Sequence, residues 1–148
     1  IRLEEDSETP IMLLHEPDTT RFLPIWIGTI EAVSIAYAQE GYVHPRPQTH
    51  DLLIDIIESL NASISEVCIT DIQDKTYFAE ITLSTIEGNV TLSSRPSDAI
   101  ALAIRSNSKI TVNPDLFNQN SIILIDDNNQ EIKEFIEFID DISPDDFV

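Results

Sequence analysis

The N-terminal part of the chain alternates short apolar runs with residues that favour turns. Residues 10–15 and 21–27 are largely apolar, and residues 16–20 between them contain Pro and Asp. Two apolar runs joined by such a turn predict an antiparallel pair of strands. Pro24 has no N–H, so its part of the second strand is expected at a sheet edge or a bulge. We expect the neighbouring Trp26 to be anchored in the core.

Three stretches show helical patterns of apolar residues. Residues 29–39 and residues 95–105 are apolar on almost every face, which is typical of helices in the interior of a fold. Pro96 suits the first turn of the second of these helices, because it lacks an N–H and its φ is already helical. Residues 49–60 carry their apolar side chains on one face, which predicts an amphipathic helix. These apolar positions are Leu52, Leu53, Ile56, Ile57 and Leu60.

The remaining pattern predicts a mostly antiparallel α+β fold. Residues 63–94 alternate apolar and polar positions around two turns, which indicates three consecutive strands. Residues 109–112 form a further short strand, followed by a single helical turn. We therefore expect antiparallel sheets packed with two or three helices in a domain that spans residues 1–125. An acidic amphipathic helix at residues 129–141 is expected in a C-terminal tail of residues 126–148.

The charge balance restricts the partners that the chain can bind. It holds 27 acidic and 8 basic residues, and its net charge of −19 repels the phosphate backbone of nucleic acids at long range. Contact with nucleic acid would have to be local, through a few arginines or a bound divalent metal. The single cysteine, Cys68, excludes a disulfide framework, and no apolar run is long enough to span a bilayer. We expect an intracellular, reducing compartment.

Three carboxylates stand at the starts of the predicted helices. Glu31, Asp51 and Asp98 each fall in a first turn, where the positive end of the helix dipole favours a negative charge. If some of them converge, they could hold Mg²⁺ or Mn²⁺ through oxygen ligands, with Asp98 and Asp51 as the expected metal ligands. A capping role is the alternative for Glu31. No organic cofactor is expected, because the sequence has three glycines and no Gly-rich phosphate loop.

Basic residues near the same helix starts offer groups for phosphate chemistry. Arg46 and Arg95 could clamp a phosphate bidentately, with Ser97 beside the second arginine. His50 could act as a general acid or base near neutral pH. The structural alternative is that each arginine forms a buried ion pair with the aspartate of the helix that follows it. Such pairs would fix the two helix entrances.

The order of these motifs resembles the bifunctional nuclease family. The resemblance rests on Leu23-Pro24-Ile25-Trp26-Ile27-Gly28, Glu31-Ala32, Arg46-Pro47 with Thr49-His50-Asp51-Leu52-Leu53, and Arg95-Pro96-Ser97-Asp98-Ala99-Ile100-Ala101-Leu102-Ala103. It covers roughly residues 10–112. The end of the chain, Ser143-Pro144-Asp145-Asp146-Phe147, is similar to the tail of actinobacterial members.

The resemblance implies an α+β fold, a cytoplasmic bacterial protein and self-association as a homodimer or other homo-oligomer. It also implies cleavage of phosphodiester bonds in RNA and DNA, with nucleic acid as the partner and no membrane association. The candidate catalytic residues are then Asp98, His50, Glu31 and Asp51, and Asp98 is the first choice because it lies at the mouth of the most buried helix. A non-catalytic regulatory or protein-interaction module that self-associates is the alternative function.

Overall fold

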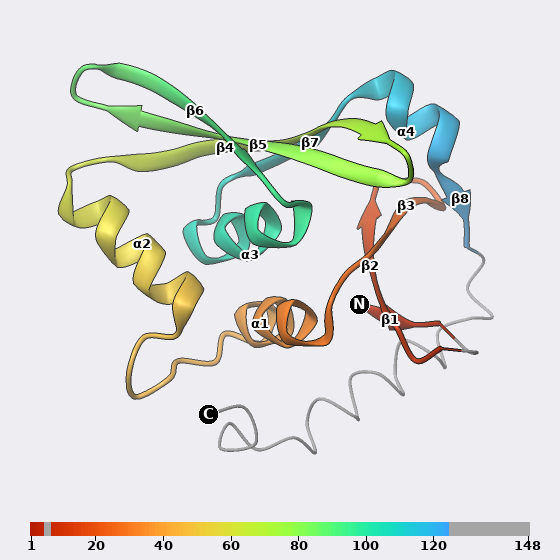
Figure 1. The fold of residues 1–148 in the computed structure, drawn as a ribbon, viewed down its shortest axis with the longest axis horizontal. Helices are drawn as coiled ribbons and strands as arrows, with labels where there is room; N and C mark the ends of the chain where they lie inside the picture. Colours follow the sequence, from red (N-terminus) through yellow and green to blue (C-terminus); the bar gives the residue numbers. More distant parts are fainter. Residues whose placement is uncertain (5–6, 125–148) are drawn as a thin grey trace.

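The computed structural model describes residues 1–4 and 7–124, and this part of the chain has an α+β fold (Figure 1). It contains two four-stranded sheets and four helices. The predicted fold class is thus confirmed for these residues. The acidic helix expected at residues 129–141 and the domain boundary expected at residue 125 lie outside the described residues.

The first sheet is antiparallel throughout, in the order β1-β2-β3-β8. Its strands are β1 (Arg2–Leu3), β2 (Pro10–His15), β3 (Arg21–Trp26) and β8 (Ile122–Ile123). The predicted pairing of residues 10–15 with residues 21–27 is confirmed. β8 pairs with β3 only at Arg21 and Phe22, so no described strand covers that edge of β3 at Pro24. The missing N–H of this proline therefore breaks no ladder bond, as expected.

Trp26 does not anchor the core, and this prediction was wrong. Leu23, Ile25 and Ile27 are buried, with exposed fractions of 0%, 4% and 9%. Alternate residues of a strand face the same side. Trp26 lies between two of these residues, so its side chain points to the opposite side and is 52% exposed. Its burial is set by its position in the alternation and not by the size of its side chain.

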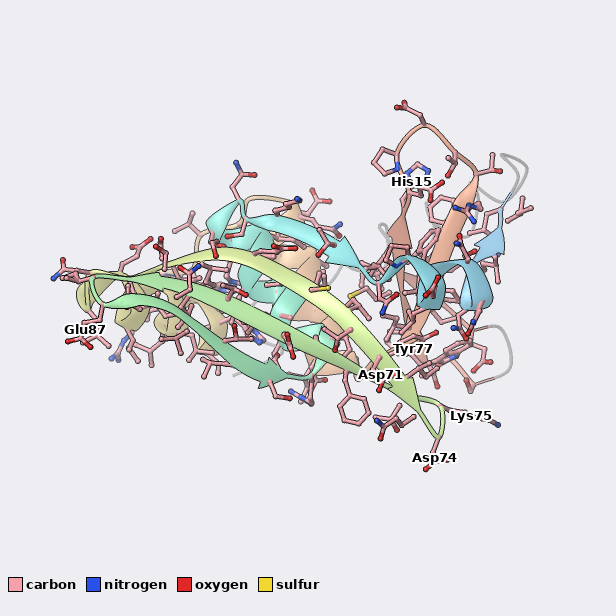
Figure 2. All side chains as sticks on the ribbon, turned by 90° about the horizontal axis from the view of Figure 1, so that it is seen from above. His15, Asp71, Asp74, Lys75, Tyr77 and Glu87 are labelled. Carbon is pink, nitrogen blue, oxygen red and sulfur yellow. The ribbon has the colours of Figure 1, made fainter. Side chains whose placement is uncertain are left out.

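The second sheet has the order β6-β5-β4-β7. Its strands are β4 (Ser63–Gln73), β5 (Thr76–Thr85), β6 (Gly88–Ser94) and β7 (Lys109–Val112). β7 runs parallel to β4, and the other pairs are antiparallel. Asp74 and Lys75 both have positive φ, which gives the tight turn between β4 and β5. Figure 2 shows this turn and the turn at Glu87 at opposite ends of the sheet.

Of the four helices, the first three lie on one side of the second sheet, and the last lies at the end of the sheet near β8 (Figure 1). They are α1 (Thr29–Gln39), α2 (Thr49–Ser59), α3 (Pro96–Ser106) and α4 (Pro114–Asn120). α3 contacts β4, β5 and β7 and also packs against α1 and α2. Its Ala99, Ala101 and Ala103 are at most 1% exposed, which confirms its predicted place in the interior. None of the described helices has the length and hydropathy needed to cross a membrane.

α2 leaves most of its apolar face exposed to solvent. It packs mainly on α3, and only Ile54 and Ile57 reach the core. The exposed side chains of this face, which we call the α2 apolar face, are Leu52 (48%), Leu53 (39%), Ile56 (46%) and Leu60 (72%). An amphipathic helix usually buries such a face. Contiguous exposed apolar side chains are typical of a surface that contacts another protein.

Candidate active site

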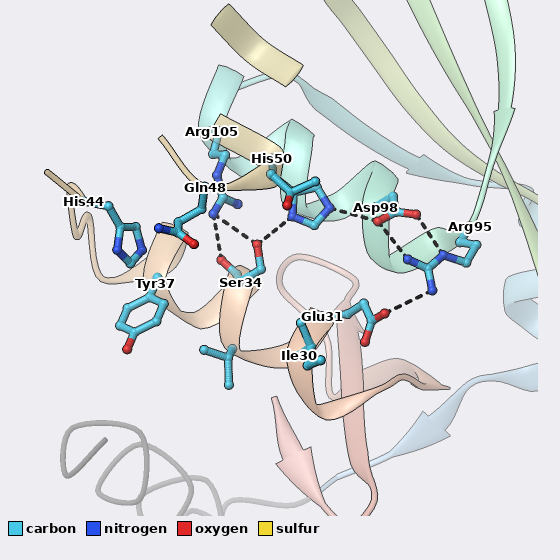
Figure 3. A pocket seen from close by; sticks show the side chains of 12 residues that line it. Ile30, Glu31, Ser34, Tyr37, His44, Gln48, His50, Arg95, Asp98 and Arg105 are labelled. Atoms are coloured by element: carbon cyan, nitrogen blue, oxygen red, sulfur yellow. Dashed lines mark hydrogen bonds and ion pairs between the residues drawn. The ribbon is translucent and has the colours of Figure 1, made fainter. Parts of the chain in front are cut away.

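A pocket of about 230 Å³ lies where α1, α2 and α3 meet (Figure 3). We call it the three-helix pocket. It is lined by Ile30, Glu31, Val33, Ser34, Tyr37, His44, Gln48, Thr49, His50, Arg95, Asp98 and Arg105. Its volume is below the roughly 300–1,000 Å³ that is usual for pockets that hold drug-sized ligands. The pocket therefore suits a group smaller than a drug-sized ligand.

The starts of α1 and α3 direct carboxylates toward this pocket. Arg95 precedes α3 with an extended backbone and Pro96 takes the first turn, so that Asp98 falls within that turn. Gly28 precedes α1 in the same way, and Glu31 lies in the first turn. A Cβ atom at Gly28 would collide with Oε2 of Glu31. The missing side chain thus lets the Glu31 carboxylate fold back over the helix start.

A continuous chain of hydrogen bonds crosses the pocket and links the three helices (Figure 3). Oγ of Ser34 lies 2.7 Å from Nδ1 of His50, and Nε2 of His50 lies 2.9 Å from Oδ1 of Asp98. Arg95 donates from Nε and Nη2 to the two Asp98 oxygens, at 2.8 and 3.1 Å. Nη1 of Arg95 donates to Oε1 of Glu31 at 3.1 Å. We call these five residues the His50 network.

Asp98 is ionised at neutral pH and fixes the proton position on His50. Burial on its own would raise the pKa of Asp98, but hydrogen bonds from Arg95 and His50 and the Arg95 charge lower that pKa below its ordinary value. A carboxylate accepts hydrogen bonds only, so Nε2 of His50 carries the proton that it donates to Asp98. In neutral His50, Nδ1 is then an acceptor, and the hydroxyl of Ser34 donates to it.

Asp51 and Arg105 form an ion pair beside the His50 network. Arg105 donates from Nε to Oδ1 of Asp51 at 2.7 Å, and its side chain is only 10% exposed. Its Nη2 donates to the carbonyl oxygen and to Oγ of Ser34, both at 3.1 Å. Burial alone would raise the pKa of Asp51, but hydrogen bonds from Arg105 and from the Gln48 backbone, together with the Arg105 charge, lower it. Arg105 thus ties α3 to both α1 and α2.

The structure brings most of the predicted site residues together and leaves others apart. The predicted residues that belong to the His50 network are Glu31, His50, Arg95 and Asp98. Asp51 is joined to this network through Arg105 and Ser34. Ser97 is buried and lines a separate hollow with Arg95 and Trp26. Arg46 is exposed and makes no hydrogen bond or ion pair with the described residues.

Of the two ion pairs expected at the starts of α2 and α3, one forms and the other does not. The pair of Arg95 with Asp98 forms, although Arg95 is 63% exposed and is therefore not a buried charge. The pair of Arg46 with Asp51 does not form, because Arg105 on α3 reaches Asp51 instead. Packing of α3 against α2 decides this choice, and the sequence neighbourhood of Arg46 gives no information on it.

Ser34 and Arg105 belong to the site but were not predicted as site residues. Ser34 follows Glu31 by three positions on α1, a spacing that places two side chains on one helix face. Arg105 follows Asp98 by seven positions, which is two turns along one stripe of α3. These spacings were the signal that could have found them.

The expectation that Asp98 and Asp51 bind Mg²⁺ or Mn²⁺ stays a prediction. Within residues 1–4 and 7–124, no group of three or more His, Cys, Asp or Glu side chains is arranged to hold a metal ion. Asp98 is bound to Arg95, and Asp51 is bound to Arg105. These carboxylates do not offer the cluster of free oxygens that a preformed Mg²⁺ site needs. We therefore derive no catalytic step through a metal.

Comparison with known proteins agrees with the motifs. A sequence model of the bifunctional nuclease domain matches residues 12–124. An uncharacterized protein of Mycobacterium tuberculosis (strain H37Rv) is 39% identical over 99% of this chain and 93% of its own length. Bifunctional nuclease 2 of Arabidopsis thaliana is 29% identical over 78% of this chain and 36% of its own length. Bifunctional nuclease 1 of the same plant is 30% identical over 70% of this chain and 33% of its own length. This chain belongs to the bifunctional nuclease domain family.

Proposed function

We propose that this protein hydrolyses phosphodiester bonds of RNA and DNA in the three-helix pocket. The observation that carries the proposal is the His50 network, in which a histidine, the carboxylate that orients it and a partly exposed arginine meet in one pocket. The plant relatives named bifunctional nuclease, at 29% and 30% identity, support the same activity. We propose the bacterial cytoplasm as its location.

Arg95 is the residue that we expect to bind the scissile phosphate. Its side chain is 63% exposed at the mouth of the pocket. Its bonds to Asp98 and Glu31 use three N–H groups of the guanidinium, and the others remain available for phosphate oxygens. These can neutralise the negative charge that develops at phosphorus. The two carboxylates hold the guanidinium in place, but they also repel a phosphate, so we expect weak substrate binding.

Aromatic rings at one end of the pocket suit an unpaired base. Tyr37 and His44 line the pocket, and the ring centroid of Tyr42 lies 5.2 Å from that of Tyr37 and 4.7 Å from that of His44. Stacking of a base on an aromatic ring contributes roughly 1–3 kcal/mol and requires no positive charge. Because the net charge of −19 disfavours long contacts with a backbone, we expect single strands to be better substrates than duplexes.

The test is cleavage of single-stranded RNA and DNA oligonucleotides by the purified protein. We expect both to be cut, and a duplex of the same sequence to be cut at least about ten-fold more slowly, because it cannot stack an unpaired base. His50→Ala, purified in the same way, controls for contaminating nucleases. Parallel reactions in EDTA, Mg²⁺ and Mn²⁺ test metal assistance, which an unchanged rate in EDTA would exclude. If the wild type cuts nothing under any of these conditions, the proposed function is wrong.

A self-associating interaction module is the second candidate function, and the α2 apolar face favours it. This face presents Leu52 and Ile56 to solvent, while Asp55 and Glu58 lie on other sides of the helix. A surface of this kind is suited to contact with an equally apolar surface. We propose that a second copy of this chain covers it, so that the protein forms a homodimer or other homo-oligomer.

Ile56→Glu is expected to convert the oligomer into a monomer without unfolding it. Ile56 is 46% exposed, so a carboxylate there costs little in the monomer but would be buried at the interface. Light scattering after size-exclusion chromatography measures the mass. Val43→Glu, at a residue that is 86% exposed outside α2, is the control and should keep the wild-type mass. A monomeric wild type at micromolar concentration would contradict self-association, and an oligomeric Ile56→Glu would place the interface elsewhere.

A further inference from the structure

His50 has no ring nitrogen left for a water molecule. Nε2 is bonded to Asp98 and Nδ1 to Ser34, and the side chain is only 10% exposed. A general base must lie within hydrogen-bond reach of the proton that it removes. Among the described residues, the hydroxyl within that reach of His50 is the one on Ser34, at 2.7 Å. Proton transfer to His50 therefore has to pass through Ser34.

Ser34 has the surroundings of an activated nucleophile. It lies on α1 at the wall of the three-helix pocket (Figure 3). Its hydroxyl donates to Nδ1 of His50, and Asp98 holds the other side of the imidazole. Nη2 of Arg105 donates to Oγ at 3.1 Å, which stabilises negative charge on that oxygen. A hydroxyl, a base and an orienting carboxylate in this hydrogen-bonded order are the parts of nucleophilic catalysis by serine.

We propose that Oγ of Ser34 attacks phosphorus and forms a covalent phosphoseryl intermediate, an inference that rests on the proposed nuclease function. The lone pair of Oγ forms the bond to phosphorus while the hydroxyl proton moves to Nδ1 of His50. The bond from phosphorus to the leaving nucleoside oxygen breaks. That oxygen lies opposite Ser34 in an in-line displacement, so it takes its proton from a water molecule on the far side and leaves a hydroxide there.

The second step releases the enzyme and consumes this hydroxide. The hydroxide forms a bond to phosphorus from the far side, and the bond between phosphorus and Oγ breaks. Oγ takes back the proton that Nδ1 of His50 has held since the first step. One water molecule is used in total. Each displacement inverts the configuration at phosphorus, so the two together retain it.

The same hydrogen bonds also hold α1 against α2 and α3, so a slower Ser34→Ala variant alone would not establish a nucleophile. The stereochemistry at phosphorus separates the two roles on DNA, because DNA has no 2′-hydroxyl to attack the phosphorus and only a covalent enzyme intermediate then gives two displacements. It can be measured on the wild type, so the result does not depend on whether a variant folds.

The experiment uses a single-stranded phosphorothioate DNA oligonucleotide of one configuration, cleaved by the wild type in water enriched in heavy oxygen. We expect retention of configuration. Mass spectrometry of an acid-quenched reaction should also show a peptide that carries a nucleotide on Ser34. Inversion with cleavage intact would exclude Ser34 as the nucleophile and leave the nuclease proposal standing. Absence of cleavage would overturn both proposals.

Two variants complete the test. Ser34→Ala should lower kcat by at least about 100-fold and yield no covalent adduct. Ser59→Ala is the matched control, since Ser59 lies at the end of α2 and its hydroxyl donates only to the carbonyl of Asp55, at 2.6 Å. This control should cut at the wild-type rate. A Ser34→Ala variant that keeps the wild-type rate would overturn the proposal as well.

Discussion

Asp98→Asn is expected to slow phosphodiester cleavage by about 10²- to 10⁴-fold and to leave the protein folded. Asparagine has nearly the same shape as aspartate, and its oxygen can still accept from Nε2 of His50. It removes the negative charge that stabilises the imidazolium when His50 takes a proton. The substitution also weakens the interaction with Arg95, which donates two hydrogen bonds to the carboxylate. The loss should appear in kcat more than in KM, because the charge on His50 develops only during the reaction.

Asp55→Asn is the matched control for this prediction. Asp55 lies on α2, is exposed and is not part of the three-helix pocket. Its substitution should change neither the cleavage rate nor the unfolding midpoint. Unfolding of each variant is followed by circular dichroism, so that a folding defect is not mistaken for lost catalysis. If Asp98→Asn cuts within about three-fold of the wild-type rate, His50 does not depend on this carboxylate for its role.

Much of the fold follows from local patterns in the sequence. The alternation of apolar and polar residues, together with the turn residues, correctly predicted the three strands of residues 63–94. The apolar run after Pro96 correctly predicted an interior helix. Patterns of this kind depend on residues that are close in the chain. Trp26 was placed wrongly because its size outweighed its position in the alternation. The exposure of the α2 apolar face was not predictable, since it depends on which elements pack around α2.

The site was only partly predictable for a related reason. Charged residues at helix starts stand out in a sequence, so Glu31, His50 and Asp98 could be singled out. Their convergence depends on how three helices pack, and the sequence does not show this packing. Ser34 lies within a largely apolar helix and looks like an ordinary residue until His50, sixteen positions later, is placed beside it. Arg46 looked equivalent to Arg95, but its side chain is exposed and makes no hydrogen bond or ion pair with the described residues.

Arg105→Met is expected to lower the free energy of unfolding by about 3 kcal/mol. Methionine keeps most of the apolar volume, but it removes the charged donor from the Asp51 carboxylate and a side-chain donor from the carbonyl oxygens of Ser34 and Ala101. Removal of one partner from a buried ion pair costs roughly 3–5 kcal/mol. We expect the lower end of this range, because the side chain of Asp51 is 31% exposed. Urea denaturation measures the difference, and Arg46→Met, at an exposed arginine, should stay within about 0.5 kcal/mol of the wild type.

The dependence on pH shows whether the charge of Arg105 or its packing produces this loss. The folded state lowers the pKa of Asp51, so the stabilisation from this group is present above its unfolded pKa of about 3.9 and is lost as the pH falls through the folded pKa. Without Arg105, the pKa of Asp51 rises, because burial is then opposed mainly by the hydrogen bond from the Gln48 backbone, and the contribution of this group to stability falls. The stability difference between wild type and Arg105→Met should therefore shrink between pH 6 and pH 3. A difference that stays constant over this range would mean that Arg105 stabilises the helices through its aliphatic packing and its hydrogen bonds to backbone carbonyl groups instead of its ion pair with Asp51.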